Sequence, residues 1–176
     1  MRLNALGLLA ISGVLAFAFV DQIVYGDLPC PLCILQRAGF VAAGFGLALN
    51  LRFGPRPSHY AIMILGAFAG GVIALRQVAL HVVPGSGSYG SAFLGLHFYT
   101  WAFVLFCLIV VGSAMMLLFD RQFRDAEKSS AALSGLALAV FGLFALLTFG
   151  NGVSTLLECA GGLCPDDPTG YLLLQK

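Results

Sequence analysis

The sequence is poor in charged residues. Its 176 residues include only 9 Lys and Arg and 8 Asp and Glu, together 10% of the chain, whereas a soluble protein carries about 25%. So few charges cannot cover the surface of a water-soluble globule, and an ordinary soluble domain is excluded. The basic residues are also scattered and the formal net charge is only +1, which leaves no basic surface for nucleic acid.

What the sequence has instead is long, uncharged and mostly apolar stretches. Sixty per cent of its residues are hydrophobic, and a helix needs about 20 apolar residues to cross a bilayer core. No sustained alternation of apolar and polar residues occurs, and lipid admits only helices or closed barrels. The sequence therefore predicts an all-α membrane protein with transmembrane helices over residues 3–21, 31–51, 60–82, 99–119 and 131–151.

Basic residues between the predicted helices fall at alternate connections. The connections 22–30 and 83–98 contain neither Lys nor Arg, and the tail carries only Lys176. Because Lys and Arg accumulate in cytoplasmic loops, we expect a cytoplasmic N-terminus and an external C-terminal tail. The residues that set this orientation are Arg2, Arg52, Arg56, Arg121, Arg124 and Lys128. Cleavage at the signal-peptidase-like site Ala16-Phe17-Ala18 would leave 22–30 on the same side.

Five cysteines occur, four of them in two closely spaced pairs. Cys30 and Cys33 form a C-x2-C at the outer mouth of the second helix, and Cys159 and Cys164 form a C-x4-C in the tail. Cys107 is alone in the fourth helix. By the predicted topology both pairs lie on the outer face, which in bacteria is an oxidising compartment, so we expect two disulfides.

The C-x2-C pair is typical of redox chemistry. Its disulfide closes a very small ring and so stabilises a fold weakly, but one of its thiolates can attack while the other resolves. A helix beginning near Pro31 places Cys33 in its first turn, where the helix dipole favours a thiolate. Arg37 follows by four residues on the same face. Its guanidinium can stabilise that thiolate or bind an acceptor such as a quinone carbonyl.

Other interpretations of the cysteines stay open. The four paired cysteines could hold a structural zinc, although an oxidising exterior disfavours it, and we expect no metal. The C-x2-C disulfide could be purely structural, and the Cys159–Cys164 pair could simply tie down a Gly-rich loop. Haem attachment is excluded because Ile34, not His, follows Cys33. Cys107 is expected to be an inert packing residue.

Charge within the membrane gives a second indication. Arg76 lies in the third helix about seven residues, or roughly 10 Å, from its outer end. A charge at that depth suggests a function, although an Arg can also extend outward to the interface. Gln77 and His81 continue a polar patch towards the outer surface. His81 could donate to a quinone or carry a proton, or it could be an isolated interfacial residue.

The segment Cys30-Pro31-Leu32-Cys33-Ile34-Leu35-Gln36-Arg37 resembles the C-x-L-C-I-x-x-R signature of the DsbB family of bacterial membrane thiol oxidases. Leu75-Arg76-Gln77-Val78 and Phe93-Leu94-Gly95-Leu96 agree with it, and the resemblance extends over roughly residues 1–120. It implies an antiparallel four-helix bundle in the inner membrane, here with a fifth helix appended. It also implies a protein-dithiol:quinone oxidoreductase that reoxidises a periplasmic thioredoxin-like thiol oxidase, DsbA.

The resemblance also implies roles for individual residues. Cys30 and Cys33 correspond to the redox pair at the helix mouth, with Cys33 next to the quinone, and Arg37 corresponds to the arginine that contacts the quinone. We add Arg76 and His81 as candidate quinone-binding residues. Whether the quinone is ubiquinone or menaquinone is left open.

One feature departs from the family. The second cysteine pair normally lies in the outer loop between the third and fourth helices, but here that loop, 83–98, has no cysteine. We therefore expect a core over 1–120 and an appended region over 121–176, in which Cys159 and Cys164 replace the loop as a mobile shuttle and complete the catalytic set. Two other functions stay open: a non-catalytic assembly or scaffold protein with structural disulfides, and a reductant conduit through Cys107.

Overall fold

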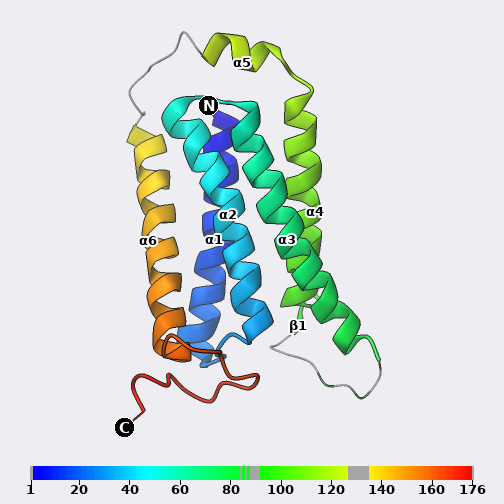
Figure 1. Ribbon diagram of the computed structural model, residues 1–176, viewed down its shortest axis with the longest axis vertical. Coiled ribbons are helices and arrows are strands. Elements are labelled where there is room, and N and C mark those ends of the chain that lie inside the picture. The colour runs from blue at the N-terminus through cyan, green and yellow to red at the C-terminus, as the bar shows by residue number, and fades with distance from the viewer. Residues whose placement is uncertain (1, 84, 86, 88–91, 127–134, 176) are drawn as a thin grey trace.

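The computed structural model describes residues 2–83, 85, 87, 92–126 and 135–175. Long helices lie side by side along one axis, and a short helix crosses one end (Figure 1). The elements are α1 (Arg2–Val20), its direct continuation as the π-helical turn η1 (Asp21–Tyr25), α2 (Pro31–Phe53), α3 (Pro57–His81), β1 (Ala92–Phe93), β2 (Leu96–His97), α4 (Phe98–Leu117), α5 (Arg121–Ala126) and α6 (Gly135–Cys159).

The prediction of an all-α membrane protein with five transmembrane helices is confirmed. Within the described residues, five helices are long and apolar enough to cross a membrane: α1 with η1, α2, α3, α4 and α6. The first four begin and end within three residues of the predicted bounds, except that α1 with η1 continues to Tyr25. The fifth differs more, because α6 runs to Cys159 rather than to residue 151; residues 131–134, its expected start, lie outside the described residues.

The extra length of α6 has a physical cause. The apolar run in the sequence is interrupted by the polar residues Asn151 and Ser154, which is why the predicted helix ended at residue 151. In the structure both side chains are buried. Asn151 binds back to the Leu147 carbonyl oxygen at 2.9 Å, and Ser154 accepts a hydrogen bond of 2.7 Å from Gln22. Because interior partners satisfy these polar groups, the helix continues for two further turns.

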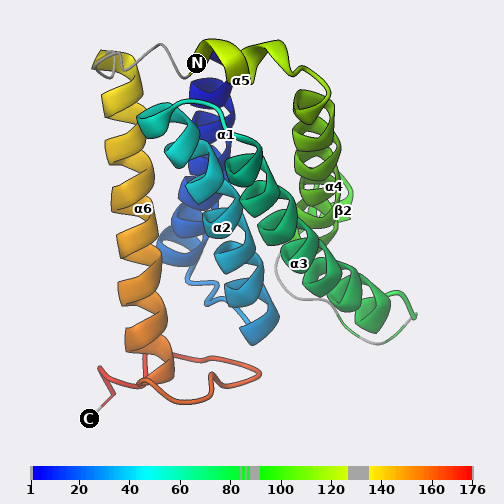
Figure 2. The same ribbon diagram turned by 45° about the horizontal axis from the view of Figure 1, so that its top comes forward.

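Helix α2 is the central element. It packs against α1, α3 and α6, and α4 packs mainly against α3. The two views show α6 and α4 on opposite sides of the α1 and α2 pair (Figures 1 and 2). Successive helices run antiparallel, as the four-helix prediction required, and the fifth helix is added against α1 and α2.

Small residues bring α2 and α3 close together. A Cβ added to Gly39 would lie 2.8 Å from the Gly70 Cα, and one added to Gly66 would lie 2.7 Å from the Ala42 Cβ. Gly66 and Gly70 have the four-residue spacing of small residues that lets two membrane helices approach closely, and both lie in this contact. Above Gly70 the Phe40 and Phe106 rings stack with centroids 4.1 Å apart.

Both cysteine pairs lie at one end of the bundle. Helix α2 begins there and α6 ends there, beside the C-terminal tail, while the N-terminus and α5 lie at the opposite end (Figure 1). We call this the cysteine end. That it faces the outside of the cell is the prediction made from the distribution of Lys and Arg.

Candidate redox site

The Cys30–Cys33 disulfide caps the first turn of α2. Cys30 is the N-cap residue in extended conformation, and Pro31 occupies the first helical turn. The Sγ of Cys30 accepts a hydrogen bond of 3.1 Å from the backbone N–H of Cys33, and the two Cα atoms are 4.9 Å apart. Cys30 is buried and Cys33 is half-buried. The prediction that Cys33 lies in the first turn of the helix agrees with this geometry.

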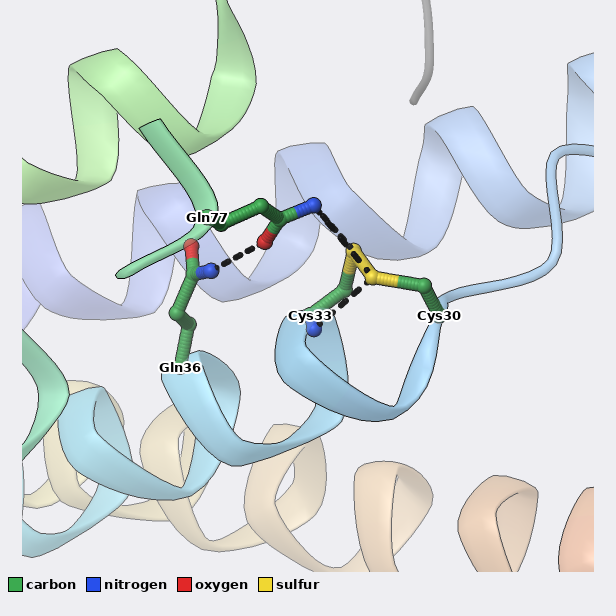
Figure 3. The surroundings of a disulfide bond; sticks show 4 residues. All are labelled: Cys30, Cys33, Gln36 and Gln77. Carbon is green, nitrogen blue, oxygen red and sulfur yellow. Dashed lines mark hydrogen bonds between the residues drawn. A yellow bond between two sulfur atoms is a disulfide. The ribbon is translucent and has the colours of Figure 1, made fainter. Parts of the chain in front are cut away.

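A glutamine from α3 contacts both sulfur atoms of this disulfide (Figure 3). The side-chain amide of Gln77 donates to Cys30 Sγ at 3.4 Å and to Cys33 Sγ at 3.7 Å. The Oε1 of Gln77 in turn accepts a hydrogen bond of 2.6 Å from Gln36 on α2. Both glutamines are buried, so a polar pair inside the bundle joins α2 and α3 beside the disulfide.

The disulfide borders a large cavity at the cysteine end. The cavity holds about 1120 Å³, and its wall includes Cys33 but not Cys30. Helices α1, α2 and α4 supply most of the wall, and residues 166–168 of the tail contribute to it. Its aromatic lining is Phe17, Phe40, Phe93, Phe98, Tyr99 and Trp101, and its polar and charged lining includes Gln36, Arg37, His81, Asp21, Asp27, Asp166 and Asp167.

Arg37 lines the cavity but reaches away from the sulfur atoms. Its guanidinium donates to Gln22 Oε1 at 2.6 Å, to the carbonyl oxygen of Ala18 at 3.0 Å and to Asn151 Oδ1 at 3.4 Å. It also lies 5.9 Å from the centre of the Phe19 ring. The side chain that contacts the sulfur atoms is therefore Gln77, whereas Arg37 binds α1, η1 and α6.

The fifth helix and the tail are joined to Arg37 through Gln22. The Nε2 of Gln22 donates to Ser154 Oγ at 2.7 Å and to the Tyr171 hydroxyl at 2.8 Å. Glu158, one turn after Ser154, is fully buried and lies within electrostatic range of Arg37. Among the described residues neither of its carboxylate oxygens has a hydrogen-bond partner, so hydrogen bonds do not compensate the burial of this side chain.

The second disulfide joins the last residue of α6 to the tail. The Cα atoms of Cys159 and Cys164 are 4.4 Å apart. Cys159 is buried, whereas Cys164 is half-buried. The chain turns through Ala160 and Gly161, both with positive φ, and the Gly162 N–H donates to the Cys159 carbonyl oxygen at 2.8 Å. All four paired cysteines thus form the two expected disulfides.

The tail folds back on α6. The backbone N–H groups of Leu172 and Leu173 donate to the carbonyl oxygens of Glu158 and Leu157 at 3.4 and 3.0 Å. Residues 166–168, which follow Cys164 closely, line the same cavity as Cys33. The sequence suggested a mobile arm, but in the structure this arm is anchored at both sides of the cysteine pair and contributes to the wall of the cavity.

The remaining predicted residues lie apart from one another. His81 lines the cavity, with its Nδ1 3.1 Å from the Gly87 carbonyl oxygen and its ring centre 5.5 Å from that of Tyr99. Arg76 is exposed on α3 and is not part of the cavity wall. Cys107, expected to be a packing residue, is instead exposed on α4, on a surface that lipid would cover.

Four buried polar residues near the disulfide and Arg37 were not predicted from the sequence: Gln22, Gln36, Asn151 and Glu158. Gln77 was predicted only as part of a polar patch. The available signal was their polarity within otherwise apolar helices, because a polar side chain in a membrane needs an interior partner. The sequence does not show which partner, since the four amide side chains of this set, Gln22, Gln36, Gln77 and Asn151, bind residues from another element.

Known proteins similar to this chain share one description. The family model of disulfide bond formation protein DsbB matches residues 1–91. The chain is 30% identical over 148 residues to disulfide bond formation protein B of Aromatoleum aromaticum, covering 64% of this chain and 89% of that protein. It is 41% identical over 80 residues to the protein of that name from Marinobacter nauticus, a match that covers 43% of this chain and 48% of that protein. It is 37% identical over 84 residues to that of Xanthomonas euvesicatoria, a match that covers 45% of this chain and 49% of that protein. No solved structure matches the chain.

Proposed function

Because the chain belongs to the DsbB family of disulfide bond formation proteins, we propose that it reoxidises a periplasmic DsbA-like dithiol protein and passes the electrons to a membrane quinone. The family and the five apolar helices make it a disulfide-forming oxidoreductase of the bacterial inner membrane. The observation that supports this proposal is the position of Cys33, which is half of a disulfide and part of the wall of a large cavity whose lining includes aromatic side chains.

The cavity has the properties that a quinone ring requires. Ligand sites for flat, mostly apolar molecules are concave, lined with aromatic side chains and supplied with a few polar groups that fix orientation. Here the aromatic lining comes from α1, α2, β1 and α4. Arg37 and His81 also line the cavity, and their side chains could donate hydrogen bonds to the carbonyl oxygens of a quinone. A second hollow of about 390 Å³ shares Ala10, Val14, Phe40 and Leu105 with the first and continues between α1 and α4. This apolar extension suits an isoprenoid chain.

Two cysteine pairs supply a relay. A thiolate of the reduced partner attacks the Cys159–Cys164 disulfide, forms a mixed disulfide, and leaves one tail cysteine as a thiolate; the second partner thiol then releases the oxidised partner. The reduced tail pair exchanges in the same way with Cys30–Cys33. A bound quinone would take up the two electrons and two protons. The tail's contribution to the cavity wall, through Asp166, Asp167 and Pro168, supports a direct exchange between the two pairs.

The test is quinone reduction by the purified protein in detergent. A reduced thioredoxin-like oxidase and a soluble quinone are added, and quinone absorbance is followed for the wild type, Cys33→Ser and Cys159→Ser. Cys107→Ser is the matched control, because Cys107 is an exposed single cysteine. We expect loss of turnover in the first two variants and full turnover in the control.

The other outcomes separate the alternatives. Loss of turnover in Cys33→Ser alone would keep the oxidase but make the Cys159–Cys164 disulfide structural. No quinone reduction with any dithiol would exclude the oxidase and favour the scaffold protein.

A further inference from the structure

Gln77 is the only described side chain for which the structure gives a hydrogen bond to either sulfur atom of the Cys30–Cys33 disulfide. We propose that Gln77 is a catalytic residue that stabilises the Cys33 thiolate formed when this disulfide opens, and that Gln36 is the positioning residue that aims its amide group. This inference deepens the proposed function, since it rests on Cys30–Cys33 being the redox pair.

The geometry fixes which end of the Gln77 amide faces the sulfur atoms. Its Nε2 lies 3.4 Å from Cys30 Sγ and 3.7 Å from Cys33 Sγ, while its Oε1 points to the Nε2 of Gln36 at 2.6 Å (Figure 3). Gln77 is 1% and Gln36 6% exposed. A buried amide that gave up these contacts would leave unsatisfied polar groups, so the pair holds its orientation.

The opening of the Cys30–Cys33 disulfide creates a thiolate that the Gln77 amide can stabilise. When an incoming thiolate attacks Cys30 Sγ, a new S–S bond forms to Cys30, the Cys30–Cys33 bond breaks, and its electron pair stays on Cys33 as a thiolate. A disulfide sulfur is a weak hydrogen-bond acceptor, whereas an ionised acceptor binds a donor about twice as strongly as a neutral one. The contact therefore strengthens as the bond breaks.

A neutral donor suits this position. Burial disfavours a thiolate, and Cys33 is half-buried on the cavity wall. The positive end of α2 helps, but the backbone N–H of Cys33 is directed at Cys30 Sγ, and Arg37 is bound to Gln22, Ala18 and Asn151. Gln77 offers Cys33 an N–H donor without placing a buried charge beside the oxidised disulfide.

The test reads the thiol directly and needs neither quinone nor partner, so it can fail while the proposed function stands. Cys30→Ser leaves Cys33 without its disulfide partner in the full chain, and its peptide is distinguished from those of Cys107, Cys159 and Cys164. The pH dependence of its carbamidomethylation, resolved by mass spectrometry on reduced protein in detergent, gives its pKa. We expect Gln77→Leu to raise that pKa, so that the thiolate fraction near neutral pH falls roughly tenfold.

Two more variants separate chemistry from packing. Gln77→Glu keeps the shape but replaces the donor by an acidic group, and we expect the largest rise. Gln36→Leu keeps the donor but removes its positioning contact, and we expect a smaller rise than for Gln77→Leu. Gln122→Leu is the matched control, because it also removes a glutamine that joins two helices, here through Tyr60 and the Met116 carbonyl at the opposite end of the bundle.

A second readout uses the intact disulfide. A stabilised thiolate favours the reduced state, so Gln77→Leu lowers the reduction potential of Cys30–Cys33 in glutathione buffers; a tenfold change in the equilibrium constant corresponds to about 30 mV. An unchanged Cys33 pKa in both Gln77 variants would overturn the proposal. So would a shift of equal size in Gln122→Leu, since it would show a general effect on the fold.

Discussion

Arg37 and Gln22 form a 2.6 Å hydrogen bond between the redox helix α2 and the turn η1 that ends the first membrane helix. The same Gln22 donates to Ser154 on α6 and to Tyr171 in the tail. One side chain therefore links the expected quinone-binding arginine to the region that is appended to the four-helix core. The fifth helix is thus part of the polar network at the redox site and does more than anchor the tail.

Replacing Gln22 tests this link. Gln22→Leu leaves the guanidinium of Arg37 without its shortest partner and removes the contacts to Ser154 and Tyr171. A hydrogen bond to a charged group contributes about 1.5–3 kcal/mol, so we expect a loss of about 2 kcal/mol in stability, measured by thermal unfolding in detergent. Gln175→Leu, at an exposed site, is the control and should stay within about 0.5 kcal/mol. Equal behaviour of both variants would mean that the link contributes nothing.

The two arginines predicted to bind quinone can be told apart. Arg37 lines the cavity, whereas Arg76 is exposed on α3 outside its wall. Lys lacks the planar fork with which Arg binds several acceptors at once, so we expect Arg37→Lys to raise the KM for quinone roughly tenfold, about 1.4 kcal/mol. Arg76→Lys should leave KM close to the wild-type value. A comparable rise in Arg76→Lys would place the quinone outside the cavity described above.

Exposure of the tail cysteines predicts which one the partner attacks. Cys164 is half-buried and Cys159 is buried, and access decides which sulfur of a disulfide is attacked. Attack on Cys164 breaks the Cys159–Cys164 bond and releases Cys159 as a thiolate. The second thiol of the partner then frees Cys164, and the tail pair is fully reduced. The partner is therefore used with its second active-site cysteine replaced and its first activated as a mixed disulfide with 5-thio-2-nitrobenzoate. In Cys159→Ser, where Cys164 is the only tail cysteine, the Cys164 thiolate should displace the thionitrobenzoate and form a mixed disulfide with this partner. Non-reducing electrophoresis detects this adduct, and Cys164→Ser should form much less of it; the reverse pattern would assign attack to Cys159.

Close packing of α2 on α3 predicts a sensitive glycine. A Cβ at Gly39 would lie 2.8 Å from the Gly70 Cα and 3.1 Å from the Phe106 ring, and overpacking typically costs about 1–3 kcal/mol. We expect Gly39→Ala to lower the unfolding temperature. Gly142→Ala, which meets no atom within 4 Å on α6, should be neutral or slightly stabilising because Ala favours a helix. A neutral Gly39→Ala would show that the two helices can separate at little cost.

The sequence by itself determined the features that depend on local pattern. The lack of charge predicted the five spans, with the end of α6 as the main difference. Pro31 and the C-x2-C spacing placed Cys33 in the first turn of a helix, because capping and turn geometry act over a few residues. The resemblance of residues 30–37 to the DsbB signature identified the family correctly. The two disulfides also agree with the prediction made from the close pairing of the cysteines on one face of the predicted topology.

Only the tertiary structure decided which polar side chains meet. Arg76 and Gln77 are neighbours on a helix that is apolar on all sides, so nothing local shows that Gln77 faces the disulfide while Arg76 is exposed. Arg37 donates a hydrogen bond to Asn151, 114 positions away in the sequence, and Gln36 donates one to Gln77, 41 positions away. In a membrane an apolar face does not mark the interior, because lipid is as apolar as the core. Which side chains face the interior is therefore determined by the packing of glycine-rich helix faces and by the polar contacts that this packing allows.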